Sequence, residues 1–224
     1  PWSLRWDWAD DLLEWFDFYL RDVGPQPRLI AEIQDDMGGW RVEDTYPPLD
    51  TEWNVTTLDQ CELVSGSDTV TTTSTTTLDC GTMEEDFRII GMPTLHMGAR
   101  ISLLGTSGHL FVEMQRGSDG AHLGHAVMDL RFSDGGKDGK VLVPGETVLA
   151  QMEFFAMDVI IPAGDSLILV ITQTGEDYVP STVSTTPVTV FLDDRSTLSL
   201  STVTRTCDDL FLPPMQEEYP RCND

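Results

Sequence analysis

Four histidines are the side chains of this sequence best suited to acid–base chemistry or metal binding: His96, His109, His122 and His125. Among them, His122 and His125 lie near two carboxylates, Asp119 and Asp129, and this stretch is the best candidate for an active site on the chain. Exposed histidines at strand ends are the simpler interpretation. A regular strand turns residues i and i+3 to opposite faces, so His122 and His125 are not expected to share a ligand.

No Gly-x-Ser-x-Gly nucleophile elbow occurs in the sequence. We therefore expect no catalytic residue, no metal ligand and no cofactor-binding residue on this chain. Residues 134–139, Asp-Gly-Gly-Lys-Asp-Gly, offer two carboxylates to a calcium ion. They lack the ligand density of a calcium loop and include a lysine, so a hairpin turn is the preferred interpretation.

The four cysteines fall into two local pairs, Cys61 with Cys80 and Cys207 with Cys222. Four cysteines allow three pairings, and the sequence alone does not choose among them. We expect the two local disulfides, each stabilising the fold by roughly 3 kcal/mol. Such bonds persist in an oxidising compartment, which favours an extracellular or cell-surface location. Asn54-Val55-Thr56 fits the N-glycosylation pattern, with Asn54 as the possible acceptor.

The charge of the chain restricts its partners. It has 38 acidic against 13 basic residues, a formal net charge of −25. A surface with no basic patch does not bind nucleic acid, and it is repelled by anionic lipid. No run of about 18 apolar residues is present, so no membrane span is expected. Solubility in a salty medium, where ions screen the repulsion, is the simplest interpretation.

The elements that would position these residues divide the chain unevenly. All six tryptophans lie between Trp2 and Trp53. Residues 5–21 have apolar side chains at three- and four-residue spacing and predict an amphipathic helix that stops at Gly24-Pro25. A short apolar strand over residues 29–33 and a turn at Gly38-Gly39 follow. A helix and one strand cannot form a core alone, so their apolar face needs a partner.

Residues 50–86 are rich in threonine and show no apolar alternation between residues 69 and 77. They predict an irregular segment or an exposed edge hairpin. From residue 87 onward, apolar residues alternate with polar ones in one segment after another. Strands are predicted over residues 95–103, 109–115, 125–132, 147–154, 167–171, 188–192 and 197–203. This series is typical of a β-sandwich or jelly roll.

Two tracts resemble a known family. Leu142-Val143-Pro144-Gly145-Glu146, with residues 159–164 (Val-Ile-Ile-Pro-Ala-Gly) and 167–171, is similar to the C-terminal domain of X-Pro dipeptidyl-peptidases and cocaine esterase (the CocE/NonD type of serine hydrolase). Residues 89–95 share this similarity. Trp15-Phe16-Asp17, Tyr19-Leu20, Trp40 and Tyr46-Pro47-Pro48 resemble the end of the preceding α/β-hydrolase domain. Asp165 stands where members of the family often have histidine.

The resemblance implies a mainly β fold: a galactose-binding-like jelly roll, preceded by a remnant helix and strand of an α/β-hydrolase domain. The implied division is residues 1–49 for the remnant, 50–86 for the threonine-rich segment and 87–224 for the jelly roll. The family's Ser, Asp and His triad would lie upstream of Pro1, so this chain should be inactive alone. The implied parent cleaves peptides after a penultimate proline, or esters or amides.

The partner implied by the resemblance is the upstream α/β-hydrolase domain. A homo-oligomer formed through residues 5–21 is a further possibility, because the aromatic stripe of that helix needs a surface to cover it. The competing hypothesis is a carbohydrate-binding or structural jelly-roll module of a secreted protein.

Overall fold

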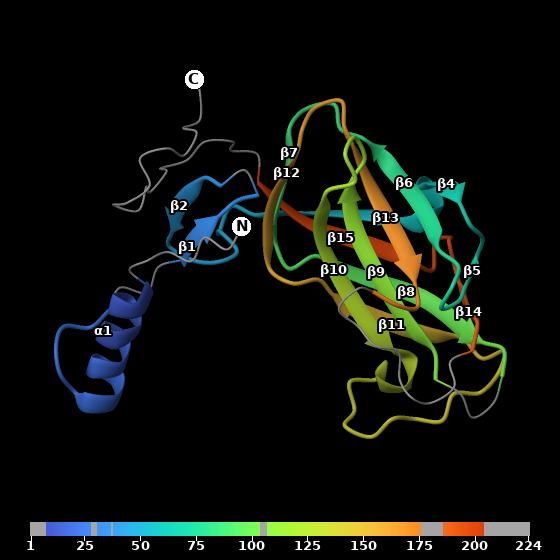
Figure 1. The fold of residues 1–224 in the computed structure, drawn as a ribbon, viewed down its shortest axis with the longest axis horizontal. Coiled ribbons are helices and arrows are strands. Elements are labelled where there is room, and N and C mark those ends of the chain that lie inside the picture. Colours follow the sequence, from blue (N-terminus) through green and yellow to red (C-terminus); the bar gives the residue numbers. More distant parts are fainter. Residues whose placement is uncertain (1–7, 28–30, 37, 104–106, 176–185, 204–224) are drawn as a thin grey trace.

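The computed structural model describes residues 8–27, 31–36, 38–103, 107–175 and 186–203. Within them, two antiparallel sheets pack face to face as a β-sandwich, and one helix and a small hairpin precede it (Figure 1). The helix α1 is Trp8–Arg21. It ends as Asp22 and Gly24 adopt positive φ values of 57° and 87°, and the expected helix is confirmed over these residues. The hairpin joins β1, Ala31–Gln34, to β2, Trp40–Glu43.

The first sheet of the sandwich has five strands in the order β10-β9-β13-β6-β4. Their bounds are β4 Glu62–Ser65, β6 Thr76–Thr82, β9 His109–Arg116, β10 His122–Asp129 and β13 Ser166–Thr172.

The second sheet has eight strands, with β12-β7-β15-β8-β14-β5 in order, β11 paired to β8 and β3 paired to β15. Their bounds are β3 Glu52–Thr57, β5 Thr69–Val70, β7 Phe87–Gly91, β8 Thr94–Ile101, β11 Val148–Glu153, β12 Met157–Ile161, β14 Val188–Val190 and β15 Thr197–Val203.

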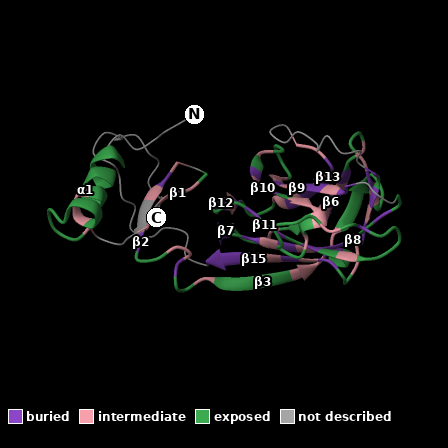
Figure 2. Ribbon diagram, turned by 90° about the horizontal axis from the view of Figure 1, so that it is seen from below, coloured by how far each residue is buried: buried purple, intermediate pink, exposed green. Residues whose placement is uncertain are grey.

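The core lies between the two sheets, where each strand contributes alternate side chains. In β13, Leu167, Leu169 and Ile171 are buried, while Ile168 and Val170 on the other face are half-buried. The apolar run of this strand predicts cover on both faces; the structure shows one face in the core and the other partly covered. In Figure 2 the buried strands of the sandwich contrast with α1, which is mostly exposed and has no buried residue.

Residues 50–86, expected to be an irregular segment or an exposed edge hairpin, form β3, β4, β5 and β6. The irregular alternative is wrong, because β6 lies inside the five-stranded sheet between β13 and β4. The edge alternative holds in part, since β4 and β5 are edge strands and β4 pairs with β6. The threonine-rich tract passes from one sheet to the other, with Val70 and Thr76 buried at its two ends. The strand predicted over residues 125–132 also stops early, because Leu130–Phe132 form a 3-10 turn, η2, capped by the Asp129 side chain.

Candidate functional site

A buried cluster of charged side chains joins the N-terminal segment to the sandwich. Arg88 on β7 donates from Nε to Asp158 Oδ1 over 2.7 Å and from Nη2 to Asp158 Oδ2 over 3.2 Å. The same Nη2 lies 3.4 Å from Asp35 Oδ2, at the end of the β1 strand. The Arg88 and Asp158 side chains are 6% and 1% exposed. Removing one partner of such a pair leaves a buried charge, which typically costs about 3–5 kcal/mol.

Asp36 extends this junction to the edge strand β12. Its backbone N–H donates to the Asp158 carbonyl over 3.0 Å, and its Oδ1 accepts from the Ile160 N–H over 3.0 Å. Its Oδ2 lies 3.6 Å from Arg116 Nη1. Burial raises the pKa of Asp36, and the Ile160 hydrogen bond and the Arg116 charge only partly offset this effect. Asp36 therefore fixes the hairpin to the sandwich at some electrostatic cost.

Tyr46 makes the third link in the junction. Its hydroxyl donates to the Met157 carbonyl over 2.7 Å and accepts from the Gly91 N–H over 3.0 Å. Gly91 has a φ of 102°, and a Cβ there would lie 3.0 Å from Pro47 Cγ and 2.8 Å from Ser201 Oγ. Only glycine meets both the backbone and the space requirements. Tyr46 and Pro47 thus lie against the sandwich. In the resemblance drawn from the sequence, they correspond to the end of the α/β-hydrolase domain.

The helix beyond this junction presents an aromatic surface. Trp15 is in edge contact with Phe16, with ring centroids 5.6 Å apart, and lies 4.7 Å from Tyr19. None of the helix residues is buried. The exposed apolar side chains of this segment, the α1 stripe, are Trp8, Leu12, Leu13, Trp15, Phe16, Tyr19, Leu20 and Val23. A stripe of this size is typical of an interface.

The sandwich does not assemble the histidines into one group with their candidate carboxylates. His96 lies on β8 in the eight-stranded sheet, whereas the other three lie on β9 and β10. Asp119 is paired with Arg116 through two hydrogen bonds of 3.1 Å. Asp129 lies 3.3 Å from His109 Nε2 and also accepts from Arg131. Both carboxylates are thus paired with arginines, and these contacts do not support the candidate grouping of Asp119 and Asp129 with His122 and His125.

The expectation that His122 and His125 face opposite ways is wrong. His122 pairs with Gln115 and Gly124 pairs with Met114, so Leu123 is an extra residue in β10 and forms a β-bulge. The bulge resets the alternation, and both histidines lie on the outer face. His125 Nδ1 is 3.1 Å from His122 Nε2.

Residues 134–139 lie in a loop after η2. Gly135 N–H donates to the Phe132 carbonyl over 2.9 Å, and Asp134 accepts from Lys140 over 2.7 Å. Within the described part of the chain, no group of three or more His, Cys, Asp or Glu residues is arranged to hold a metal ion. The expected hairpin turn is wrong, because this loop leads from β10 in the five-stranded sheet to β11 in the eight-stranded sheet, and these two strands are not paired.

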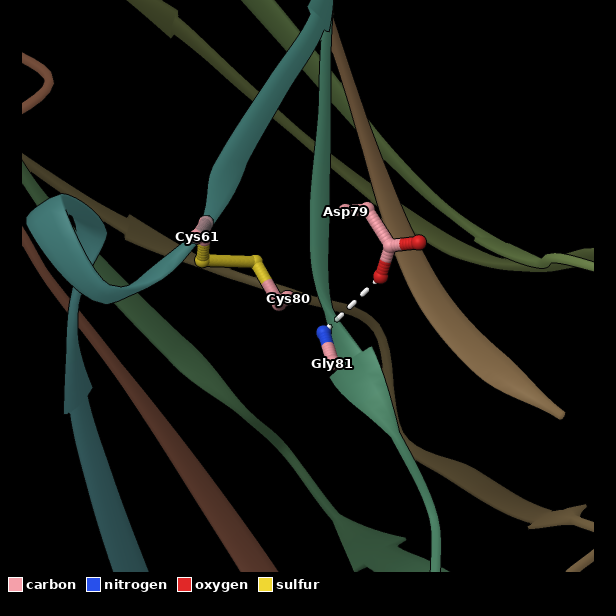
Figure 3. The surroundings of a disulfide bond; sticks show 4 residues. All are labelled: Cys61, Asp79, Cys80 and Gly81. Carbon is pink, nitrogen blue, oxygen red and sulfur yellow. Dashed lines mark hydrogen bonds between the residues drawn. A yellow bond between two sulfur atoms is a disulfide. The ribbon is translucent and has the colours of Figure 1, made fainter. Parts of the chain in front are cut away.

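A disulfide bond joins Cys61, between η1 (Leu58–Gln60) and β4, to Cys80 on β6 (Figure 3). Beside it, the Gly81 N–H donates to Asp79 Oδ1 over 2.9 Å. The second expected pair, Cys207 and Cys222, lies outside the described residues. Asn54 is exposed on β3, where its Nδ2 donates to Thr202 Oγ1 over 2.7 Å.

The junction residues Arg88, Asp158 and Asp35 were not singled out from the sequence. The available signal was the presence of single charges within apolar strands, Arg88 before Ile89-Ile90 and Asp158 before Val159-Ile160. A charge flanked in this way is either on an open strand face or paired in the interior.

No protein-family model and no curated protein matches the chain. Solved structures do match. A CocE/NonD family hydrolase from Staphylococcus aureus aligns at a TM-score of 0.62 and 13% identity, over 87% of this chain and 46% of that one. An aminopeptidase from a marine-sediment Thaumarchaeota archaeon aligns at 0.58 and 12%, over 89% and 44%. An α-amino acid ester hydrolase aligns at 0.54 and 13%, over 88% and 45%.

These matches define the class of fold. The chain has the β-sandwich architecture found in CocE/NonD-type hydrolases, in agreement with the resemblance drawn from the sequence, and it spans less than half the length of each matched hydrolase. No helix in the described residues is both long and apolar enough to cross a membrane.

Proposed function

We propose that this chain is the non-catalytic C-terminal region of a secreted serine hydrolase resembling X-Pro dipeptidyl-peptidases and cocaine esterase. The observation that carries the proposal is the likeness of its fold to three hydrolases, over 44–46% of each. In the parent protein, a serine activated by histidine would attack a carbonyl carbon, and water would release the acyl group. The substrate would be a peptide with penultimate proline, an ester or an amide.

The sandwich would be the galactose-binding-like jelly roll of that parent, and α1 with the β1–β2 hairpin would be the end of its α/β-hydrolase domain. Two features support this division. The α1 stripe is exposed, as expected of a helix that packs against a sheet in another part of a longer protein. The junction of Asp35, Asp36 and Tyr46 with β7 and β12 would hold the two domains in a fixed arrangement.

An extracellular or cell-surface location fits the Cys61–Cys80 disulfide. The role of the chain would then be structural: it would form part of the wall of the hydrolase domain and a stable β-module beside it.

Hydrolysis assays of the isolated chain test whether it has catalytic activity of its own. The purified chain should hydrolyse neither an Ala-Pro chromogenic amide nor a short-chain ester, because it has no nucleophile elbow. A His122→Ala, His125→Ala variant is the matched control, since these residues are the best alternative site. Turnover that survives stringent purification and is lost on substituting any one residue of this chain would refute the proposal.

A carbohydrate-binding module is the second candidate, and Trp53 favours it. This side chain is 56% exposed on β3. Trp53 shares its sheet face with Val55, which is also exposed and pairs with the half-buried Ser199 of β15. Its own register partner, Ser201, is buried and donates to the Ile90 carbonyl. Binding of neutral oligosaccharides by the wild-type chain, and its loss in Trp53→Ala but not in Trp15→Ala, would favour this function over the first.

A further inference from the structure

The two histidines on the bulged strand β10, His122 and His125, form a pair outside the junction between the N-terminal segment and the sandwich. Leu123 is the extra residue of the bulge, and it is buried, as is Ala126 three positions later. With both of these side chains in the core, His122 and His125 lie together on the outer face of the five-stranded sheet. In this sheet β10 is next to β9 (Figure 1). The bulge therefore creates a pairing that a regular strand forbids.

The distance between the two rings suits a shared ligand. His122 Nε2 and His125 Nδ1 are 3.1 Å apart. Two nitrogens at that separation, each roughly 2.0–2.1 Å from a common ion, subtend an angle of about 98° at it. A tetrahedral centre would require about 3.3 Å between them. The His122 ring is exposed and can turn, so the pair can occupy two adjacent positions of a tetrahedral or an octahedral centre.

One ring of the pair is held in place and the other is accessible. His125 is stacked on Phe111, with centroids 5.3 Å apart, and touches the edge of Phe155 at 5.2 Å. His122 is exposed, so its ring can turn until both lone pairs converge on an ion. Gly124 between them has no side chain; a Cβ there would lie 2.4 Å from Met157 Cε. The backbone of the bulge is thus packed tightly against β12.

The surroundings favour a cation. Glu113 is the register partner of His125 on β9, and it is half-buried. The chain as a whole carries a formal charge of −25. A divalent ion at this position adds two positive charges to a negative surface, and water completes its coordination.

We propose that His122 and His125 bind one divalent transition-metal ion through Nε2 and Nδ1, with Cu²⁺ bound most strongly, as is general for nitrogen ligands among the divalent first-row metals. The ion replaces the proton held between the two rings, and the ring that carried this proton changes tautomer, so that both imidazoles stay neutral with their N–H on the nitrogen away from the ion. The site has two protein ligands, so binding is reversible and weaker than at a closed structural site. It is independent of the hydrolase function proposed above.

Calorimetric titration of the full chain with NiCl₂ at pH 7.5 tests the proposal. One ion should bind per chain, and His122→Gln or His125→Gln should each weaken binding at least tenfold. His96→Gln, which changes a histidine on the other sheet, should bind as the wild type does. Circular dichroism of each variant establishes that it is folded. Binding should weaken strongly at pH 5, because protons compete for both imidazoles.

Electron paramagnetic resonance of the Cu²⁺-loaded chain gives a second, independent readout. The wild type should show coupling to two imidazole nitrogens, and each single variant should show coupling to one. Nickel binding that is unchanged in the His122→Gln, His125→Gln double variant would overturn the proposal. So would a wild-type copper spectrum without two coupled imidazoles.

Discussion

Asp36 and Asp119 should affect stability in opposite directions as pH changes. Burial raises the pKa of Asp36 above its ordinary value of 3.8. The protonated form of Asp36 therefore adds stability to the fold below pH 3.8, and this stability is lost as pH rises through the folded-state pKa. At pH 7 the charged form lowers the free energy of unfolding. The hydrogen bond from Arg116 lowers the pKa of Asp119. Its contribution is present above pH 3.8 and is lost as pH falls.

The Asp36→Asn variant should consequently melt slightly higher than the wild type at pH 7, because the amide keeps an acceptor for the Ile160 N–H without a buried charge. The gain should be at most a few degrees and should shrink toward pH 3. Asp119→Asn is the matched control and should melt slightly lower at pH 7. Thermal melts from pH 3 to 8 measure both, and a loss of stability in Asp36→Asn at pH 7 would show that its pairing with Arg116 outweighs burial.

The Cys61–Cys80 disulfide closes a loop with a sequence separation of 19 residues. Replacing both cysteines with serine should reduce the free energy of unfolding by about 3 kcal/mol, mainly because the unfolded chain gains freedom. Urea denaturation of the variant beside the wild type measures the difference. An unchanged midpoint would mean that the bond adds little to this fold. A Cys207→Ser, Cys222→Ser variant shows whether the second expected pair contributes separately.

Among the described elements, α1 is a helix with no buried residue. Its stripe of large aromatic side chains lies in water, and burial of apolar area stabilises by roughly 25 cal/mol per Å². We expect the isolated chain to self-associate through residues 5–21. Sedimentation of the wild type beside a Trp15→Glu, Phe16→Glu variant tests this, with Leu149→Glu on the exposed face of β11 as control. If the wild type and the variant both sediment as folded monomers, the expectation fails.

Element periodicity explains which parts of the fold were predictable. The spacing of apolar residues predicted α1 and most strands after residue 87, because each follows from a local pattern. The strands within residues 50–86 were not predicted, because the threonine-rich tract that leads into β6 shows no apolar alternation. The strand β6 is stabilised by pairing with β13 and β4, which a local pattern does not reveal. The bulge at Leu123 was also missed. Register depends on the neighbouring strand, so the pairing of His122 with His125 could not be derived from β10 alone.

At the scale of the whole molecule, charge is the dominant property. The 38 carboxylates outnumber the 13 basic side chains, so repulsion among the carboxylates exceeds their attraction to the basic groups. Salt screens this repulsion beyond about 10 Å at 0.1 M. The melting temperature should therefore rise from low to molar sodium chloride. The measurement is a series of thermal melts at fixed pH, with sodium sulfate as a second salt. A flat or falling curve would mean that the charges are locally balanced by pairs such as Arg88 with Asp158.

We propose above that this chain belongs to a larger serine hydrolase and carries none of its catalytic residues. The most direct measurement is hydrolysis by the protein expressed from its native reading frame, extended upstream of the codon for Pro1. We expect a nucleophile elbow and a histidine shortly before α1, with amidase or esterase activity that disappears when the elbow serine is replaced by alanine. An upstream sequence without these residues, or full activity in the isolated chain, would contradict it.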